Sequence, residues 1–257
     1  MTRPETIFLL YHEIALPGRE LCQTAAGYVR YVLDAPEFEA HMLAIQQAGL
    51  RGVSVSQAVE SPERSLAITF DDGCETDSLV AAPTLKRFGF GATFYVTFAH
   101  VGQKGYLSVS QLRELSSAGF EIGCHSLTHS YLPDLEDGRL RCEVFDSKLR
   151  LEEMIGKAVE HFSCPGGRYD LRVVHLAREA GYRTIATSIP RTNSARSDCF
   201  LLGRVAMTRG FKQQTFEKFC RGEIGWTFAL NAQLRDGAKR LLGNAAYDRV
   251  RAMLLGQ

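Results

Sequence analysis

Two adjacent carboxylates end an apolar segment in the first third of the chain. Asp71 and Asp72 directly follow LAITF at 66–70 and precede Gly73. At the end of a strand, neighbouring carboxylates repel and raise each other's pKa unless a cation or hydrogen bonds absorb the charge. A bound metal ion would remove this conflict. Taken alone, Asp-Asp-Gly is also a common turn, because turns favour aspartate and glycine.

A pair of histidines farther along the chain could complete a metal site. His125 and His129 lie four residues apart in HSLTH. On a helical turn their imidazoles would point the same way and could bind one ion, with a carboxylate as the third ligand. Zinc, cobalt, nickel and manganese all accept such ligands, and zinc is the ion we expect. For this motif alone, two surface or capping histidines are the simpler alternative.

Recurring helix ends indicate how these residues are positioned. QQAGL at 46–50, KRFGF at 86–90, SSAGF at 116–120 and REAGY at 178–182 each end an amphipathic pattern with a glycine and a large apolar residue. A helix that ends in a left-handed cap and passes to a strand has this form. Capping boxes are expected at the helix starts, from Asp34 with Glu37 and from Ser108 with Gln111.

The apolar runs predict the fold class. IFLLY at 7–11, LAITF and GATFYV at 91–96 are continuous rather than alternating, which is typical of strands covered on both faces. With βα repeats of roughly 30 to 40 residues, the pattern predicts an α/β fold with a parallel sheet inside a layer of helices. The roughly seven expected strands can close a barrel, and an open doubly wound sheet is the alternative.

The polar residues fall at the ends of these strands. His12 follows IFLLY, the two aspartates follow LAITF, His125 follows EIGC, and Pro165 with Gly166 follows HFSC. Because chemistry in parallel α/β folds sits where the carboxyl ends of the strands converge, we expect these side chains to meet at one end of the sheet.

The motifs resemble those of the NodB-type polysaccharide deacetylases, carbohydrate esterase family four. The likeness covers roughly residues 7–207 and rests on YHEI at 11–14, TFDDG at 69–73, HSLTH at 125–129 and CPGGRYD at 164–170. It implies a deformed (β/α)7 barrel. It also implies that Asp72, His125 and His129 hold a divalent metal and that Asp71 is the general base.

Two positions depart from the pattern of that family. Many members carry an arginine before the proline of the third motif, where it orients the base. Here that position is Ser163, with Arg168 nearby as a substitute to consider. Many members also carry a late Leu-x-His as general acid, but the matching region here reads LLGRVAM at 201–207. His12 is the candidate acid, since the first and last strands of a closed barrel are neighbours. The alternative is that His12 only hydrogen-bonds a loop.

The turn after HFSC is the expected place for the substrate carbonyl. Its residues are Pro165, Gly166, Gly167 and Arg168. Small residues let the main chain come close, so a backbone N–H near Gly166 could bind an oxyanion. The alternative is a turn that merely ends a strand.

Charge and cysteine content indicate which partners and which cellular compartment to expect. The net charge is +1, so no overall field favours nucleic acid as a partner. The seven cysteines are scattered and lack any C-x-x-C spacing, which disfavours a disulfide framework or a zinc ribbon and indicates free thiols in a reducing compartment. The first apolar run, Ile7–Tyr11, is too short for a signal peptide or a membrane helix. We therefore expect a cytoplasmic protein.

Two regions are expected along the chain. Residues 1–210 form the deacetylase-type barrel, and residues 211–257 form a C-terminal helical extension packed on it. The tail from Trp226 has helical apolar spacing, which most often packs a helix on its own domain. A weak association with the inner membrane surface is the alternative. The sequence sets no oligomeric state.

Together these features predict a metal-dependent hydrolase that removes N-acetyl groups from an acetamido sugar. The expected substrate is a polysaccharide or a lipid-linked glycan precursor. One alternative is a deformylase acting on a lipid-linked amino sugar. The other is a sugar-binding protein that keeps the barrel and the metal without turnover, which the missing arginine and late histidine would favour.

Overall fold

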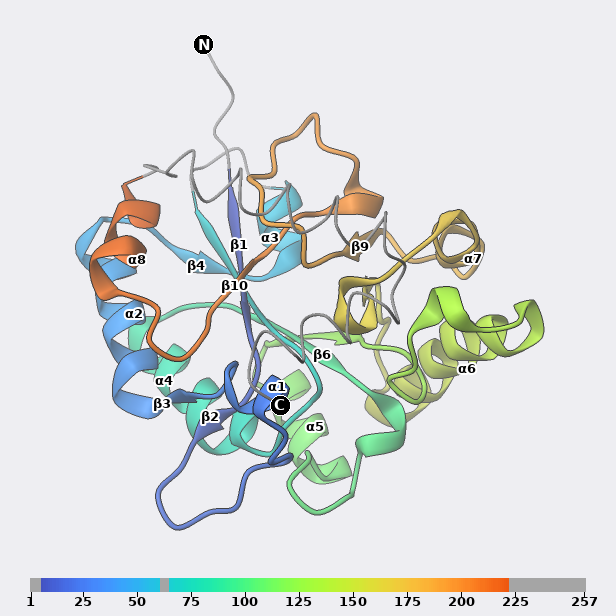
Figure 1. Cartoon of the computed structure of the whole chain (residues 1–257), viewed down its shortest axis with the longest axis horizontal. Helices are drawn as coiled ribbons and strands as arrows, with labels where there is room; N and C mark the ends of the chain where they lie inside the picture. The colour runs from blue at the N-terminus through green and yellow to red at the C-terminus, as the bar shows by residue number, and fades with distance from the viewer. Residues whose placement is uncertain (1–5, 61–64, 222–257) are drawn as a thin grey trace.

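The computed structural model describes residues 6–60 and 65–221. Its main sheet is entirely parallel, with the strand order β10-β1-β5-β6-β7-β8-β9 and a short strand, β4, beside β5 (Figure 1). The strands are β1 Ile7–Tyr11, β4 Gly52–Val53, β5 Leu66–Phe70, β6 Thr93–Val96, β7 Glu121–Cys124, β8 His161–Ser163, β9 Thr184–Ala186 and β10 Val205–Ala206. A separate parallel pair joins β2 Ile14–Ala15 to β3 Leu33–Asp34.

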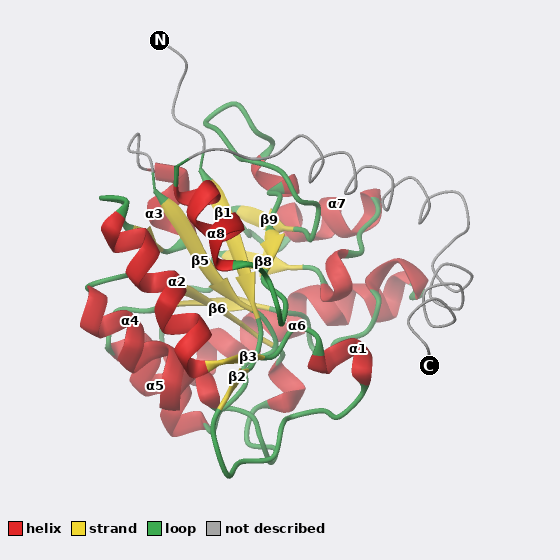
Figure 2. Ribbon diagram, turned by 60° about the vertical axis from the view of Figure 1, so that its left-hand side comes forward, coloured by secondary structure: helices red, strands yellow, loops and turns green. Residues whose placement is uncertain are grey.

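Helices surround this sheet on its outer side (Figure 2). The α-helices are α1 Ala26–Val29, α2 Ala35–Gln47, α3 Val55–Glu60, α4 Ala82–Phe88, α5 Val109–Ser117, α6 Asp137–Ile155, α7 Leu171–Glu179 and α8 Gln213–Cys220. Short helical turns are the π-helical η1 Asp77–Ala81 and the 3₁₀ turns η2 Phe98–His100, η3 Leu132–Asp134, η4 Pro165–Gly167 and η5 Cys199–Leu201.

The strand order identifies a barrel and excludes the doubly wound alternative. The long strands follow one another around the sheet in chain order, and β10 returns beside β1, whereas a doubly wound sheet reverses direction at a switch point. Between β9 and the segment that leads into β10, the described residues form an isolated bridge from Ala186 to Leu202, with backbone hydrogen bonds from Leu202 to Ile185 and from Thr187 to Leu202. The fold is therefore the expected deformed α/β barrel, with its irregular closure at this seam.

The local signals at helix ends are largely confirmed. Gly49, Gly89, Gly119 and Gly181 all adopt positive φ, between 66° and 90°, as a left-handed helix end requires. The capping box of Ser108 with Gln111 is formed at the start of α5. The one predicted at Asp34 is wrong: Asp34 is the N-cap of α2 but makes no side-chain cap bond. Its carboxylate instead faces Arg209, at 3.7 Å.

Two apolar layers explain the continuous hydrophobic runs. Along β1, Leu9 belongs to the large core that the helices cover, while its neighbour Phe8 belongs to a smaller cluster with Ala67, Tyr95 and Ala186. Alternate residues of a strand point to opposite faces, so we assign the smaller cluster to the inside of the barrel. Strands buried on both faces read as unbroken apolar segments.

The predicted extension is only partly within the described residues. Its first helix, α8, packs on α2, where the rings of His41 and Phe216 stack with centroids 3.9 Å apart. The tail beyond residue 221, with its predicted helical spacing, lies outside the described residues. Within the part that is described, none of the helices has the length and apolar character needed to cross a bilayer.

Candidate active site

Three of the predicted site residues meet at the carboxyl ends of β5 and β7. One donor atom from each of Asp72, His125 and His129 lies within 4.8 Å of the other two. Asp72 Oδ1 is 3.5 Å from His125 Nε2 and 3.2 Å from His129 Nε2. Two imidazoles and one carboxylate are the donor set of many catalytic metal sites.

The hydrogen bonds of His125 leave the correct nitrogen free for a metal. Its Nδ1 lies 2.8 Å from the carbonyl oxygen of Ser163, and a carbonyl can only accept, so Nδ1 carries the proton. The lone pair is then on Nε2, which faces Asp72. Burial lowers the pKa of His125 to about 4, so the ring is neutral at pH 7. A second hydrogen bond of this kind orients metal-binding histidines in general.

The HSLTH segment is a loop, so the predicted helical turn is wrong. Ser126 and His129 adopt positive φ values of 66° and 62°, which a helix does not allow. The loop is held by Glu143, a buried carboxylate on α6 that accepts hydrogen bonds from the backbone N–H groups of Leu127 and Thr128 at 2.9 and 2.8 Å. The histidines converge through this loop conformation rather than through helical spacing.

Asp72 is prepared for a cation. Burial alone would raise the pKa of this carboxyl, but the His129 imidazole, whose Nε2 lies 3.2 Å from Oδ1, and the charges of the other nearby histidines hold it below its ordinary value. Within the described residues, its buried Oδ1 has no hydrogen-bond partner that meets ordinary geometry. A buried, ionised oxygen without a hydrogen bond is costly. The donor set and this oxygen together fit a divalent metal ion.

Asp71 has a different partner, the buried guanidinium of Arg204. The two form a bidentate pair, with Arg204 Nη1 2.7 Å from Asp71 Oδ1 and Nη2 2.8 Å from Oδ2. The other donors of Arg204 reach the Thr187 carbonyl and the hydroxyls of Thr69 and Ser163. Each nitrogen of this buried cation is therefore hydrogen-bonded, as its burial requires.

Arg204 keeps Asp71 ionised. Burial alone would raise the pKa of Asp71, but the charge of Arg204, with that of His125 and the hydrogen bonds from Arg204, brings it below its ordinary value. Its Oδ2 also lies 3.8 Å from His125 Nε2. The Asp71 carboxylate is thus fixed beside the cluster of Asp72, His125 and His129 by a partner of its own.

Sequence reasoning missed Arg204 and considered Arg168 in its place. The guanidinium of Arg168 lies 3.8 Å from the ring centroid of Tyr131, and the ion pair with Asp71 is made by Arg204. Ser163 explains how: its small side chain leaves room for Arg204 and donates to Asp71 Oδ2 at 3.2 Å. The available signal was the lone arginine in LLGRVAM, between apolar residues beside the last strand.

His12 lies beside the two aspartates at the end of β1. Burial lowers its pKa, and the charges of Asp72 and Asp71 oppose this effect only in part. Its ring is 4.9 Å from that of Tyr31, and its buried Nδ1 has no hydrogen-bond partner in the described part of the chain. The imidazole is therefore neutral at rest and close enough to the carboxylates to sense their charge.

The CPGG segment forms a tight turn whose glycines are required. Gly166 and Gly167 have φ values of 60° and 68°. A Cβ would lie 2.9 Å from a ring carbon of Tyr131 at the first position and 2.6 Å from Ser188 at the second. The N–H groups of Gly167 and Arg168 donate to the carbonyls of Cys164 and Pro165. This turn brings the main chain close to the side chains of Tyr131 and Ser188.

Comparisons with known proteins show which family this chain resembles. The polysaccharide deacetylase family model matches residues 58–185. YxkH of Bacillus subtilis (strain 168), named as a polysaccharide deacetylase, is 29% identical over 187 residues, which is 70% of this chain and 67% of that protein. The peptidoglycan-N-acetylglucosamine deacetylase of Bacillus cereus is 33% identical over 135 residues, which is 52% of this chain and 61% of that protein. This chain thus spans about two thirds or less of these relatives.

The fold has close structural counterparts. The Streptococcus pyogenes deacetylase PplD, solved in complex with acetate, superposes with a TM-score of 0.73 and 20% identity, over 83% of this chain and 96% of that one. At this identity the likeness concerns the fold. The family match, the curated relatives and the shared barrel agree that this chain belongs to the NodB-type polysaccharide deacetylase family.

Proposed function

We propose that the protein is a metal-dependent N-deacetylase that hydrolyses the acetamido group of a sugar in a glycan or a glycan precursor. The observation that carries this proposal is the division between two adjacent aspartates. Asp72 faces His125 and His129, and Asp71 is locked by Arg204 beside them. One carboxylate suits a ligand and the other a base, which is what metal-assisted amide hydrolysis needs.

The residues of the site have distinct roles in this proposal. Asp72, His125 and His129 would hold a divalent ion, with zinc as our choice and cobalt, nickel or manganese as alternatives. Such an ion polarises the amide carbonyl and acidifies water. Asp71, ionised by its pairing with Arg204, accepts the proton of the attacking water.

The turn after β8 and the end of β1 supply the remaining groups. Gly167 and Arg168 already use their N–H groups within the turn, so we assign the oxyanion contact to the N–H of Gly166. His12 would protonate the leaving amine, which is otherwise a poor leaving group. Because burial lowers its pKa, His12 must gain this proton during turnover.

We further propose that the substrate is a precursor on the cytoplasmic side of the membrane. The support is that the seven cysteines, four of them buried, are free thiols, which suits a reducing compartment. Weak association with the inner membrane surface belongs to this proposal, and it would rest on the tail that lies outside the described residues.

Arg204 weakens the case for a protein without turnover. That alternative depended on a missing arginine and a missing late histidine, and the bidentate pair with Asp71 supplies an arginine from the segment just before β10. Deformylation would use the same groups on a smaller acyl substituent, so the two hydrolytic activities are best separated by assay.

The test is acyl release from a panel of N-acetylated glycans and N-formylated amino sugars, with the metal-loaded protein and measurement of both acetate and formate. We expect acetate release that is lost in Asp71→Asn and in the metal-free protein. Formate release alone would establish the deformylase. No release from any substrate, with metal bound in full, would favour the sugar-binding alternative.

A further inference from the structure

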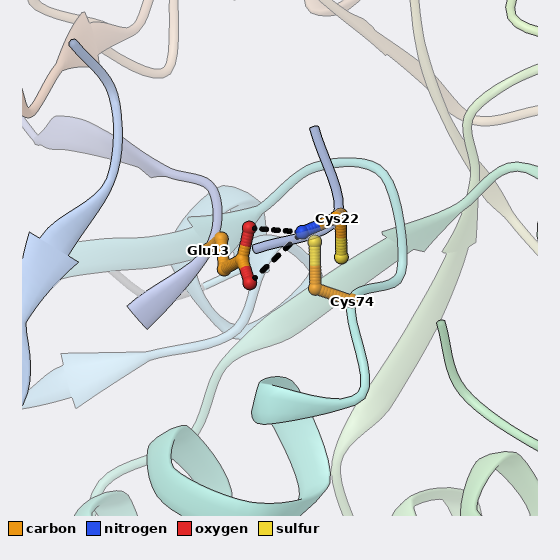
Figure 3. A group of neighbouring side chains, drawn as sticks. All are labelled: Glu13, Cys22 and Cys74. Atoms are coloured by element: carbon orange, nitrogen blue, oxygen red, sulfur yellow. Dashed lines mark hydrogen bonds between the residues drawn. The ribbon is translucent and has the colours of Figure 1, made fainter. Parts of the chain in front are cut away.

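A second group of side chains with donor atoms suited to a metal lies on the segments that also carry His12 and Asp72. It consists of Glu13, Cys22 and Cys74, with one donor atom from each within 4.8 Å of the other two (Figure 3). Glu13 and Cys74 are buried and Cys22 is half-buried. Two thiols and a carboxylate are a donor set that zinc and cadmium take readily.

The chain brings these residues together through the elements that carry the catalytic groups. Glu13 directly follows His12 at the end of β1, and Cys74 lies two residues after Asp72 beyond β5. Cys22 comes from the loop between β2 and α1, which passes close to Gly105. A Cβ at Gly105 would lie 3.3 Å from the sulfur of Cys22, and its φ is 93°. The close approach of Cys22 therefore depends on a glycine.

Hydrogen bonds already hold the donor atoms in place. The backbone N–H of Cys22 donates to Glu13 Oε2 at 3.0 Å, and the Cys22 thiol donates to the Gly105 carbonyl at 2.9 Å. The Tyr28 hydroxyl donates to Glu13 Oε2 at 2.9 Å and lies 3.3 Å from Cys74 Sγ. Ligands around zinc are separated by roughly 3.5 Å, so a contraction of the order of an ångström would bring the donors onto one ion.

The surroundings of the cluster also call for a cation. Asp77, which begins η1 one turn after Cys74, is fully buried, and neither carboxylate oxygen has a hydrogen-bond partner among the described residues. The nearest basic side chain in the loop, Arg19, forms an ion pair with Glu75. Buried acidic groups are normally paired or bound to metal, and within residues 6–60 and 65–221 the carboxylates of Glu13 and Asp77 lie near two thiols without an ion pair to a basic side chain.

We propose that Glu13, Cys22 and Cys74 form a second, structural metal site for a thiophilic divalent ion such as Zn²⁺, with the Tyr28 hydroxyl in the fourth position. Binding replaces two S–H bonds by two metal–thiolate bonds and releases two protons. The ion would join the loop between β2 and α1 to the segments that follow β1 and β5. It would thereby fix the backbone that carries His12 and Asp72. This site does not depend on the proposed enzymatic function.

The test uses Cd²⁺, because cadmium bound to thiolates gives an ultraviolet charge-transfer absorption that histidine and carboxylate ligands do not give. Metal-free, full-length protein, kept reduced with a phosphine, is titrated with Cd²⁺ while absorption and bound metal are measured. We expect two bound ions, of which one produces the absorption. Cys22→Ser with Cys74→Ser should lose the absorption and one ion. His125→Ala with His129→Ala should lose the other ion and keep the absorption.

Two further variants make the result decisive. Cys199→Ser removes an exposed thiol outside the cluster and should leave the absorption unchanged. Glu13→Gln keeps the size of the side chain and should weaken the absorbing site by about tenfold or more, which can be measured even if the double cysteine variant fails to fold. The proposal is overturned if the wild type shows no thiolate absorption, if Glu13→Gln leaves affinity unchanged, or if Cys22 and Cys74 form a disulfide under the reductant.

Discussion

Asp71 and Asp72 are neighbours in the chain but have opposite partners. Asp72 turns to two imidazoles because its φ of 81° rotates its side chain away from the direction set by β5. Asp71 keeps the strand direction and points to Arg204 inside the barrel. Backbone conformation, rather than residue type, therefore divides the work between two identical side chains.

This division predicts different effects for two identical substitutions. Asp72→Asn should weaken metal binding, because an amide oxygen is a poorer ligand than a carboxylate. Asp71→Asn should keep the metal and lose turnover by roughly 100-fold or more, since the base is removed. Metal content by elemental analysis and acetate release by assay measure the two effects. Equal metal loss in both variants would contradict the assigned roles.

The proposed role of His12 as general acid can be tested by changing the leaving group of the substrate. If it protonates the amine, His12→Ala should slow cleavage of the acetamido sugar strongly while metal content stays unchanged. An activated aryl acetate needs little protonation of its leaving group, so the variant should retain far more of its activity on that ester. The two rates are measured in wild type and variant. A similar fractional loss on amide and ester would remove His12 from the mechanism.

At the scale of elements, the carboxylate of Glu121 holds helix α3 at the amino-terminal end of the strands. Glu121 begins β7, yet its oxygens accept hydrogen bonds from the backbone N–H groups of Val55 and Ser56 in the first turn of α3. His161 Nε2 lies 3.4 Å from the same carboxylate. The Glu121 side chain thus caps the N-terminus of α3, and the helix dipole there stabilises the negative charge of the carboxylate.

Glu121 should make stability depend on pH in a defined range. Burial alone would raise its pKa, but the hydrogen bond and charge of His161, with the hydroxyls of Ser56 and Thr93, lower it from 4.5 to about 2. A lowered carboxyl pKa stabilises the fold above the unfolded value and loses this effect as the pH falls through the folded value. The contribution is therefore complete above pH 4.5 and lost between pH 4.5 and about 2.

The variant Glu121→Gln tests this expectation. At pH 7 it should lower the free energy of unfolding by about 2 kcal/mol, and the difference from wild type should narrow as the pH falls below 4.5. Urea unfolding at several pH values measures it. Glu153→Gln, at an exposed position of α6, is the control and should have little effect. A difference that stays constant with pH would show that the carboxylate charge is not involved.

At the scale of the whole molecule, Arg204 ties the seam of the barrel. It lies just before β10 and reaches Asp71 after β5, Ser163 on β8 and the carbonyl of Thr187 after β9. In the described structure, β9 and the segment before β10 are also joined by the bridge from Ala186 to Leu202 and by backbone hydrogen bonds of Leu202 and Arg204. One side chain therefore contributes both to the closure of the barrel and to the ionised state of Asp71, the proposed base.

Substitution of Arg204 should affect stability and turnover together. Arg204→Met leaves Asp71 buried without its partner and should cost about 3–5 kcal/mol. Arg204→Lys should recover part of this stability but not the turnover, because an ammonium cannot form the bidentate pair. Arg183→Met, which removes surface pairs to Glu60 and Glu160, is the matched control and should cost less than about 1 kcal/mol. Thermal unfolding and acetate release measure both effects.

An outcome in which Arg204→Lys keeps full turnover would contradict the positioning role. Loss of stability in Arg204→Met without any change in turnover would contradict it equally, because the two effects arise from the same pair of hydrogen bonds.

Local signals in the sequence predicted much of this architecture. Glycines such as Gly89 and Gly119 marked the helix ends because their left-handed conformation is a property of one residue. The buried strands were visible because both faces are apolar. Asp72 and His125 lie just after strands, so the parallel sheet was enough to bring these two together.

Contacts between distant segments were beyond the reach of such signals. Arg204 meets Asp71 across 133 positions, and nothing in LLGRVAM specifies which carboxylate it contacts. The spacing of the two histidines in HSLTH fits a helix. Glu143 instead accepts hydrogen bonds from the backbone N–H groups of Leu127 and Thr128 in a loop conformation, which the spacing cannot predict. The cluster of Glu13, Cys22 and Cys74 was invisible because its members come from three separate segments.

The three non-glycine residues with positive φ in the described chain, Asp72, Ser126 and His129, all lie in the candidate site. A left-handed conformation costs a residue with a side chain about 1 kcal/mol relative to glycine. The backbone of the candidate site is therefore in a conformation that costs stability. In the metal-free protein, His129→Gly should be more stable than His129→Ala by about 1 kcal/mol, although both lack the imidazole. Leu127, in the same loop, has a negative φ, so Leu127→Ala should be more stable than Leu127→Gly. Chemical unfolding of these two variants and of the two His129 variants would show whether the penalty belongs to the backbone at position 129.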